Sequence, residues 1–531
     1  MKLVHSLTTV SLLVSLQNVA FAEDDLMSIL EGKNATPAAQ FVESEEIAKL
    51  KKAVNPSSAE QNIFFQFLVE KNYEKALFQW SAAFTGSAFA QTETGKALES
   101  FLNYKNGLKL TGVEGLLAIK DPEKIDNSVI SLWKENLNDK DPVWGMAQVT
   151  WHPFWTQTFG VAAEMAVVLQ KSYVNEEIPA LTELIKKTPV DSVERNLLQW
   201  QLVLNLGIRG DSAKAAQVLA HLMKAKNNPI DMDLMTITAG RLLYQNGFLD
   251  ASLKYYEKIS KKSDYWFQAQ EEMAWAYMRK GEPQNAMAIT KTLTYPHFKG
   301  WVGIESYLLG SFSSLKVCDY PGVLKTMKSI KTQFGDHLIA LEKLTADPNQ
   351  PAATNLMKLI ASGPVDISKL GKDAHILPNQ ASRDEVLVLL VKRKQFLTKE
   401  SEVAEQLYAK SLTFGNLQGH FETLKNQVQI RAQMTEGAGY QRIQELAKAE
   451  LEDSKQVMQR LHIVEVEMIQ QVDSASKFLK HANGGESKKG STGSNSKYAM
   501  SFANDKEIWF DELSNYKVDV KKGCAKSVAK E

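Results

Sequence analysis

The chain has 531 residues, which is too long for one compact core and predicts several domains or one extended repeat array. Its 62 basic residues equal its 62 acidic residues, so no overall charge attracts it to nucleic acid or to an anionic membrane. Hydrophobic residues make up 44% and charged residues 23%, which excludes a wholly disordered chain. Because 29 glycines and 15 prolines are few for the many turns of a large β protein, the composition favours an all-α fold.

The first 22 residues have the pattern of a cleaved signal peptide. Lys2 precedes an apolar run over 7–16, and Ala20 and Ala22 frame a small-x-small cleavage site. The run is shorter than the roughly 18 to 20 residues of a membrane-spanning helix, and no later run reaches that length. We therefore expect cleavage after Ala22, a periplasmic or secreted protein without a transmembrane segment, and a lead-in over 23–59.

The usage of cysteine and histidine argues against a metal site. Cys318 and Cys524 could form one disulfide in an oxidising compartment, could both stay unpaired, or could leave Cys524 to join another protein. The nine histidines are scattered, without the spacing of zinc ligands. Phosphate-loop, dinucleotide-binding and serine-hydrolase motifs are missing from the sequence as well. We therefore expect no metal, no cofactor and no enzyme activity.

One pair of residues leaves an enzymatic alternative open. Glu305 followed by Ser306 has the order of the catalytic glutamate and its serine in peptidoglycan lytic enzymes. The next residues, 307–310, read Tyr-Leu-Leu-Gly and continue a helix, whereas that family needs a Gly-Leu-Met-Gln turn. The local sequence therefore favours a structural glutamate.

Internal repetition is the most informative feature of the sequence. Gly247 and Gly281 each close an apolar helical stretch and lie 34 residues apart, which is the period of tetratricopeptide repeats. Small residues recur at the corresponding positions where two paired helices would cross closely: Gly240, Ser252, Ala274 and Ala286.

Related units lie on both sides of these two. Ala215 upstream and Ala76 near the N-terminus occupy the small position of a second helix, and Gly310 closes the first helix of a downstream unit. Residues 60–340 resemble the tetratricopeptide (TPR) family, although the family's large fourth residue and closing proline are missing. The resemblance implies stacked helix pairs in a superhelix whose concave groove binds peptides or proteins. An unrelated helical bundle would also place small and large residues at such spacing.

The C-terminal part of the chain changes character. Residues 341–381 contain several proline turns and are expected to form an irregular connection. Long helices are expected over 382–482, because apolar residues recur in alternating steps of four and three over 447–479. A single helix is predicted over 440–479. Two polar residues interrupt its apolar seam, which favours packing against the helices of 384–435 over a self-associating coiled coil.

A separate tail follows a stretch rich in glycine and serine. Residues 483–497 carry no large apolar side chain and predict a flexible linker. In the tail, 498–531, the side chains of Trp509, Phe510 and Leu513 should not be left in water, so we expect the tail to dock on its own array or on a partner. The segment resembles the C-terminus of exported repeat proteins of gliding and predatory bacteria, including envelope components of gliding machinery.

These features favour an exported protein-binding scaffold of the bacterial cell envelope. The resemblance implies other envelope proteins as its partners, and the balanced charge predicts that nucleic acid is not among them. The alternative is an accessory or degenerate subunit of a peptidoglycan hydrolase.

Overall fold

The computed structural model describes residues 43–169, 178–298, 301–363, 365, 367–414 and 417–482. Every regular element in these ranges is a helix, and no strand occurs in them, so the all-α prediction is confirmed. The predicted signal peptide, the start of the lead-in, the linker and the tail lie outside the described residues.

An N-terminal group of short helices packs around aromatic side chains. It comprises α1 (Glu45–Val54), α2 (Ala59–Val69), α3 (Tyr73–Ala83), α4 (Ala88–Gln91), α5 (Glu93–Lys105), α6 (Lys109–Leu117), η2 (Pro122–Lys124), α7 (Asn127–Asn136), η3 (Pro142–Met146), α8 (Phe154–Phe159) and α9 (Val161–Leu169). The ring centroid of Phe64 on α2 lies 5.6 Å from that of Trp80 and 5.2 Å from that of Phe84, and all three rings are buried. Ser44, Ser58 and most of the other cap residues accept a backbone N–H at a helix start, so local sequence sets many of the boundaries.

The middle of the chain forms successive helix pairs. Its elements are α10 (Ile178–Lys187), α11 (Val193–Arg209), α12 (Ser212–Leu222), α13 (Met232–Gln245), α14 (Leu249–Tyr256), α15 (Trp266–Lys280), α16 (Pro283–Leu293), η5 (Pro296–Phe298), α17 (Glu305–Lys316) and α18 (Tyr320–Ala346). Helices α11 and α12, α13 and α14, α15 and α16, and α17 and α18 are packed as neighbours. Gly210 and Gly281 end α11 and α15 with φ of 89° and 83°, a left-handed conformation that glycine adopts without strain.

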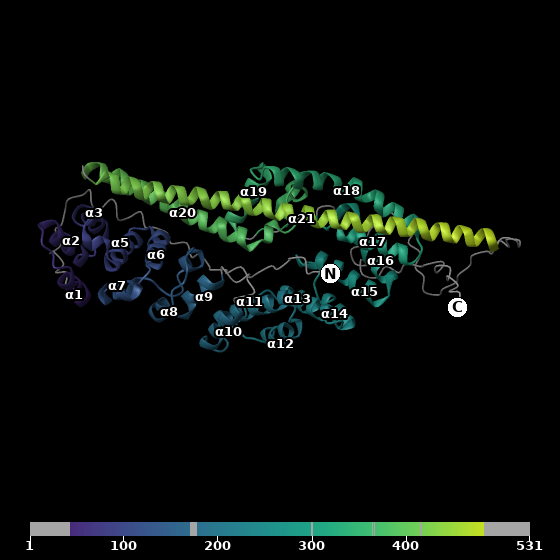
Figure 1. Ribbon diagram of the computed structural model, residues 1–531, viewed down its shortest axis with the longest axis horizontal. Coiled ribbons are helices and arrows are strands. Elements are labelled where there is room, and N and C mark those ends of the chain that lie inside the picture. The colour runs from purple at the N-terminus through teal and green to yellow at the C-terminus, as the bar shows by residue number, and fades with distance from the viewer. Residues whose placement is uncertain are drawn as a thin grey trace.

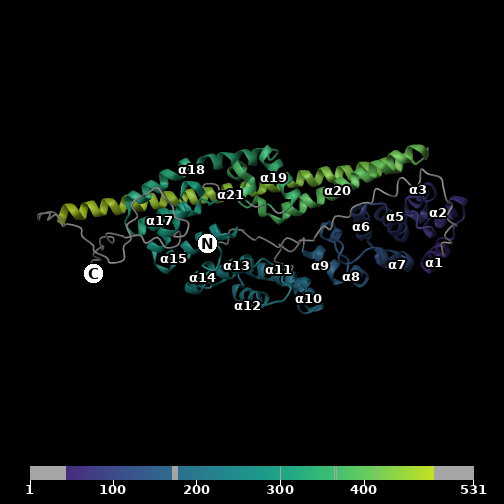
Figure 2. The same ribbon diagram turned by 180° about the vertical axis from the view of Figure 1, so that it is seen from behind.

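The first helices α13, α15 and α17 follow one another along one side of the array, which we call its inner side. Helix α13 contacts α15, and α15 contacts α17, whereas α12, α14 and α16 have no comparably close contact with one another. Figures 1 and 2 show the same arrangement, with α11 and α13 facing the long C-terminal helices and with α12 and α14 on the far side.

The expected irregular connection over 341–381 contains a regular helix. Helix α18 continues to Ala346, and α19 (Pro351–Ser362), η6 (Ile367–His375) and η7 (Ala381–Arg383) follow it. The connection is fixed to its surroundings by His337 on α18. Its Nδ1 lies 2.9 Å from the carbonyl oxygen of His375, and its Nε2 lies 2.8 Å from Oε1 of Glu450. The backbone N–H and the amide of Asn379 both donate to Glu450 as well, at 2.8 and 2.7 Å.

Two long helices follow, and the second of them runs along the whole molecule (Figure 1). They are α20 (Glu385–Ser411), which ends in η8 (Leu412–Phe414), and α21 (Gln418–Ala482), a helix of 65 residues. At 1.5 Å per residue, α21 is about 98 Å long. Figure 1 shows α21 extending from the N-terminal group at one end to α17 and beyond at the other, with α20 beside its first part. The prediction that this helix begins at Tyr440 was wrong, because polar and apolar residues continue the helical pattern back to Gln418.

The start of the apolar seam of α21 packs as predicted, because Ala447 and Leu451 lie in one cluster with Leu387 and Val391 of α20. Its later residues Val457, Leu461 and Met468 are buried against α17 and α18, not against the helices of 384–435. Ser454, one of the two polar interruptions, is also buried. Only the first half of α21 pairs with α20, because α20 is less than half as long. The long helix therefore holds the two ends of the molecule together.

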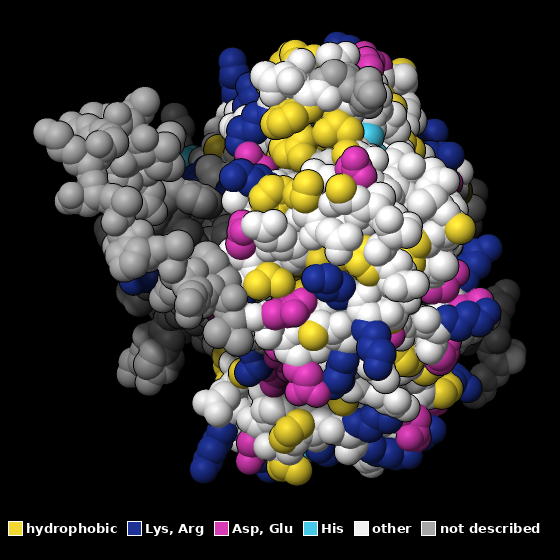
Figure 3. All heavy atoms as spheres, turned by 90° about the vertical axis from the view of Figure 1, so that its left-hand side faces the viewer, with side chains coloured by type: hydrophobic (Ala, Val, Ile, Leu, Met, Phe, Trp, Pro, Cys, Tyr) yellow, Lys and Arg dark blue, Asp and Glu magenta, His cyan; other side chains and the backbone are white. Residues whose placement is uncertain are grey.

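The turn between the long helices carries exposed apolar side chains. Leu412 and Phe414 are 49% and 58% exposed, and the ring of Phe414 lies 5.3 Å from that of Phe78 on α3. Figure 3 faces this end of the molecule and shows hydrophobic side chains gathered near its top, where the turn lies. Within the described ranges, no helix is both long enough and apolar enough to cross a membrane.

Candidate functional site

The small residues predicted from the repeat lie at helix crossings. A Cβ atom on Gly240 of α13 would come within 2.6 Å of the ring of Tyr256 on α14, so only glycine fits there without a shift. The hydroxyl of Ser252 on α14 donates to the carbonyl oxygen of Gly240 at 2.8 Å. Gly247 follows α13 with φ of 82°. This pair of helices is therefore in close contact at the two positions that the sequence singled out.

The other predicted packing residues are buried too. Ala76, Ala215, Ala274 and Ala286 have no exposed surface, and a Cβ atom added to the buried Gly310 would lie 3.5 Å from the side chains of Thr290 and Thr326. Their burial fits the predicted register of the helix pairs. The predicted ligand-binding role of the groove does not follow from this packing alone, because a core residue holds the array together without touching a ligand.

A set of polar side chains lines the inner side of the array, and we call it the inner-face cluster: Arg241, Glu271, Glu272, Trp275, Glu305 and Ser306. Arg241 on α13 forms a bidentate pair with Glu272 on α15, because Nη2 donates to Oε1 at 2.6 Å and Nε donates to Oε2 at 3.0 Å. Their side chains are only 16% and 20% exposed. Such planar, partly desolvated pairs are stronger and more directional than exposed ion pairs. The pair joins the first helices of two successive units.

The neighbouring carboxyl groups are shifted toward the protonated form. Ser306 at the start of α17 donates its hydroxyl to Oε2 of Glu271 at 2.5 Å. Burial, together with the nearby Glu305 carboxyl, raises the pKa of Glu271 to about 8. Burial also raises the pKa of Glu305, an effect that the guanidinium of Arg460 opposes. At neutral pH the inner face therefore presents a neutral carboxyl beside an arginine–carboxylate pair.

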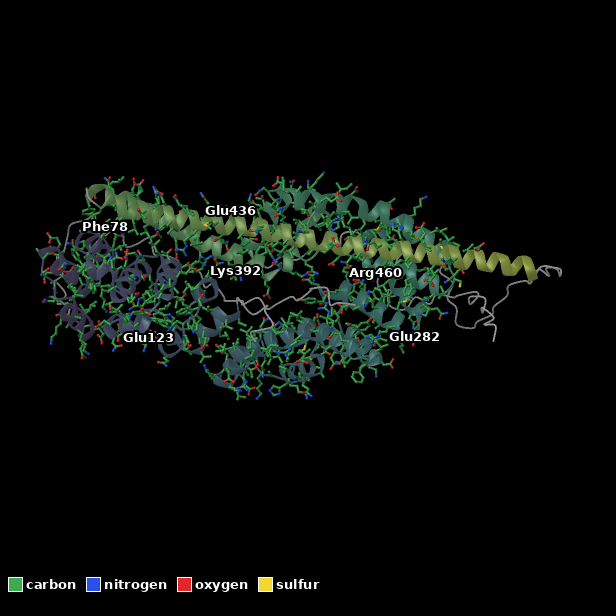
Figure 4. All side chains as sticks on the ribbon, viewed as in Figure 1. Phe78, Glu123, Glu282, Lys392, Glu436 and Arg460 are labelled. Carbon is green, nitrogen blue, oxygen red and sulfur yellow. The ribbon has the colours of Figure 1, made fainter. Side chains whose placement is uncertain are left out.

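The C-terminal helices cover part of this inner side. Trp275 of the cluster packs beside the apolar contact of α17 with Leu461 and Val464 of α21. Arg383 in η7 donates to the carbonyl oxygen of Asp264 at 3.2 Å, and its guanidinium lies 5.8 Å from the ring centre of Tyr265. Figure 4 shows Arg460 on α21 over the end of the array that carries Glu282. The inner side at α17 is thus occupied by a helix of the same chain.

A second polar cluster, which the sequence analysis missed, attaches the long helices to the N-terminal group. Glu400 on α20 is 2% exposed and accepts the backbone N–H groups of Leu110 and Thr111 at 2.5 and 3.2 Å. It also accepts the hydroxyl of Thr111 at 2.6 Å. Helix α6 has no side-chain cap of its own, so Glu400 supplies the cap from a helix 290 residues away.

The same contact contains a carboxylate held by two arginines. Glu114 on α6 accepts from Nη1 of Arg393 at 2.6 Å and from Arg431 on α21. Arg393 also donates to the carbonyl oxygen of Met146, and Arg431 donates to the hydroxyl of Thr111 at 2.9 Å. Buried charges are tolerated when they are paired and hydrogen-bonded on several sides, as here. The sequence contains one signal that could have identified Glu400 as buried. Its position continues the helical spacing of Leu397, Ala404 and Leu407, which are buried on the same side of α20.

The remaining predicted residues are only partly covered by the structure. Cys318 lies half-buried in the turn between α17 and α18, with φ of 58°. Cys524, Trp509, Phe510 and Leu513 lie outside the described residues, so the disulfide and the docking of the tail stay predictions. In the part of the chain that the structure describes, no group of three or more His, Cys, Asp or Glu side chains is arranged to hold a metal ion.

Comparison with known proteins finds no family model that matches the chain, and no curated protein or solved structure that is significantly similar to it. The function is therefore argued from the arrangement of the helices and from the chemistry of the inner face.

Proposed function

We propose that the protein is an exported scaffold of the bacterial cell envelope that recruits partner proteins through the inner face of a TPR-like array. Signal-peptide-like residues 1–22 support export, and the 34-residue spacing of Gly247 and Gly281 supports the TPR-like repeat. The resemblance of the tail to envelope components of gliding machinery makes a gliding assembly one setting to test. Other envelope proteins are the expected partners.

The observation that carries the proposal is the contact between α21 and the inner side of α17. Val457, Leu461 and Val464 of α21 lie against Ile304, Tyr307 and Leu308, with Trp275 beside them. The end of the array thus already holds an amphipathic helix, which is one of the recurring ways in which helical grooves bind peptides. Helices α11, α13 and α15 offer the same kind of surface to a partner in trans.

The polar groups of the inner face would give such a partner its orientation. Arg241 and Glu272 are 16% and 20% exposed, so each retains some accessible surface. Tyr244 and Arg279 add an aromatic ring and a guanidinium 5.1 Å from its centre. Binding surfaces commonly combine aromatic and arginine side chains in this way. A helix or peptide with apolar and charged residues on one side is the expected ligand.

Charge swaps on the two sides of the array test this proposal. Full-length protein is used for affinity capture from envelope extracts, with R241E/E272R reversing the inner pair while keeping an ion pair. The control is D250K/K280D, which reverses the exposed Asp250–Lys280 pair at the edge of the array. The inner swap should lower the amount of captured partner about tenfold, and the edge swap should leave it unchanged. Equal capture by both variants, or recovery of the protein alone, would contradict the proposal.

One observation supports a second candidate function. A carboxyl group with its pKa raised to about 8, such as Glu271, is protonated at neutral pH and could act as a general acid. We propose as the alternative an accessory or degenerate subunit of a peptidoglycan hydrolase. Against this function, Ser306 is bound to Glu271, and Glu305 opens a regular helix. Release of soluble muropeptides from purified sacculi, lost in E271Q, would favour the alternative.

A further inference from the structure

Helix α21 carries a ridge of exposed aliphatic side chains near its end. Ile463, Val466, Ile469 and Val472 are 65%, 54%, 58% and 43% exposed. Side chains spaced by three residues form one ridge that is inclined to the helix axis. The first two lie on the side opposite Leu461, Val464 and Met468, which are buried against α17 and α18. The ridge is therefore separate from the inner face used in the proposed function.

A row of four such residues on one helix is unusual for a surface that only meets water. The neighbouring turns of α21 follow the normal pattern, with charged and polar residues such as Lys455, Gln459 and Arg460 at the exposed positions. Ile430 and Met434 of the same helix are also exposed, at 53% and 69%, but the four residues of the ridge form a longer continuous row. A continuous apolar row of this kind indicates a surface that another segment covers.

We propose that residues 505–520 of the same chain cover this ridge. That segment contains three large apolar side chains, Trp509, Phe510 and Leu513, and these residues lie outside the described part of the chain. Aromatic rings and aliphatic side chains packed together remove the most apolar surface from water for the fewest ordered residues.

The length of the connecting chain fits this occupant. Val466 precedes Ala482 by 16 residues of helix, which corresponds to about 24 Å. Between Ala482 and Trp509 lie 26 residues, many of them glycine and serine, whose root-mean-square reach as a flexible chain is about 25 to 30 Å. The effective concentration of a tethered segment is highest when its reach matches the span.

A second copy of the chain is the other candidate occupant. The small apolar area of the ridge argues against it. Four half-exposed aliphatic side chains present a few hundred Å², well below the roughly 1,000 Å² that a lasting contact between separate molecules needs. A tethered segment needs less area, because the linker already holds it near the ridge.

Site-specific photo-crosslinking in the full-length protein tests the proposal. A benzoyl-phenylalanine replaces Val466, and a matched control places it at Ile430, which is 53% exposed on the same helix. Ile430 is 36 residues away, or about 54 Å, beyond the usual reach of the tail. Equal amounts of isotopically light and heavy protein are mixed, so that crosslinks within and between chains are distinguished by mass.

We expect Val466 to crosslink to peptides from 505–520 of its own chain, and Ile430 to give at least about tenfold less of this product. The tail variant W509A/F510A should lower the Val466 product about tenfold, because it removes the two largest rings of the segment. Crosslinks between light and heavy chains would overturn the proposal in favour of a second copy. A Val466 yield no higher than that of Ile430 would overturn it as well.

Discussion

At the scale of single residues, the contact of Gly240 with Tyr256 explains why small residues recur along the chain. The ring of Tyr256 fills the space that a side chain at Gly240 would need, and Ser252 bonds the carbonyl oxygen of the same residue. These contacts lie between neighbours only 12 to 16 residues apart in sequence. Local spacing was therefore enough to find them without knowledge of the rest of the fold.

Overpacking tests the register of these crossings. Replacing Ala76, Ser252 or Ala286 with leucine should lower the free energy of unfolding by about 1 to 3 kcal/mol, because none of the three side chains has exposed surface to expand into. A matched control is Ala220→Leu on α12, where the alanine is exposed. Urea denaturation of each variant measures the change. If the variants lose no more unfolding free energy than the control, the assigned register of the helix crossings is wrong.

His337 predicts a pH dependence of stability. Burial alone would lower its pKa, but the hydrogen bond and the charge of Glu450 outweigh burial and raise it above the usual value. Facing it are Glu450 from α21, the His375 carbonyl from η6 and the Phe334 ring from its own helix. A raised histidine pKa stabilises the fold fully below about pH 6.5, and this stabilisation is lost as the pH rises through the folded-state value.

The comparison of H337Q with wild type measures this effect. The stability difference, from urea denaturation, should be largest near pH 6 and should shrink toward pH 9. The control H462Q replaces a histidine whose side chain is 72% exposed, so this substitution should change the free energy of unfolding less than H337Q does. A difference for H337Q that grows with pH would contradict the assignment of a charged His337.

At the scale of helices, the cap of α6 illustrates what sequence reasoning could not supply. The start of α6 carries no capping side chain in its own sequence, and its cap comes from Glu400 on a distant helix. Periodicity places Glu400 on a buried seam, but it does not say which helix end that seam meets. Contacts this far apart in sequence depend on the path of the whole chain, which no local pattern encodes.

Removing this cap should weaken the attachment of α20. In E400A, the backbone N–H groups of Leu110 and Thr111 lose their acceptor while staying buried or half-buried, which should cost about 1 to 3 kcal/mol. The control E402A removes an exposed glutamate from the same helix. Chemical denaturation measures both, and local hydrogen exchange should rise at the start of α6 in E400A alone. An equal stability of the two variants would show that the cap contributes nothing.

At the scale of the whole molecule, α21 joins parts that the sequence presented as separate regions. The all-α class and the long C-terminal helices followed from composition and from the seam over 447–479. The partner was predicted correctly for the start of that seam, where Ala447 lies with Leu387, and wrongly for its later part, because Val457, Leu461 and Met468 would suit any apolar helix face of matching shape. The seam instead meets α17 and α18, so the long helix covers one end of the inner face and leaves α11, α13 and α15 as the candidate binding surface.

Hydrogen exchange of the captured complex tests the central claim most directly. Amide protection is compared for the full-length protein alone and bound to the partner recovered from envelope extracts. The account predicts added protection in the first helices of the pairs, 232–245 and 266–280, and none in the second helices, 212–222 and 249–256. Added protection in the second helices, or no change in either set, would contradict a scaffold that binds through its inner face.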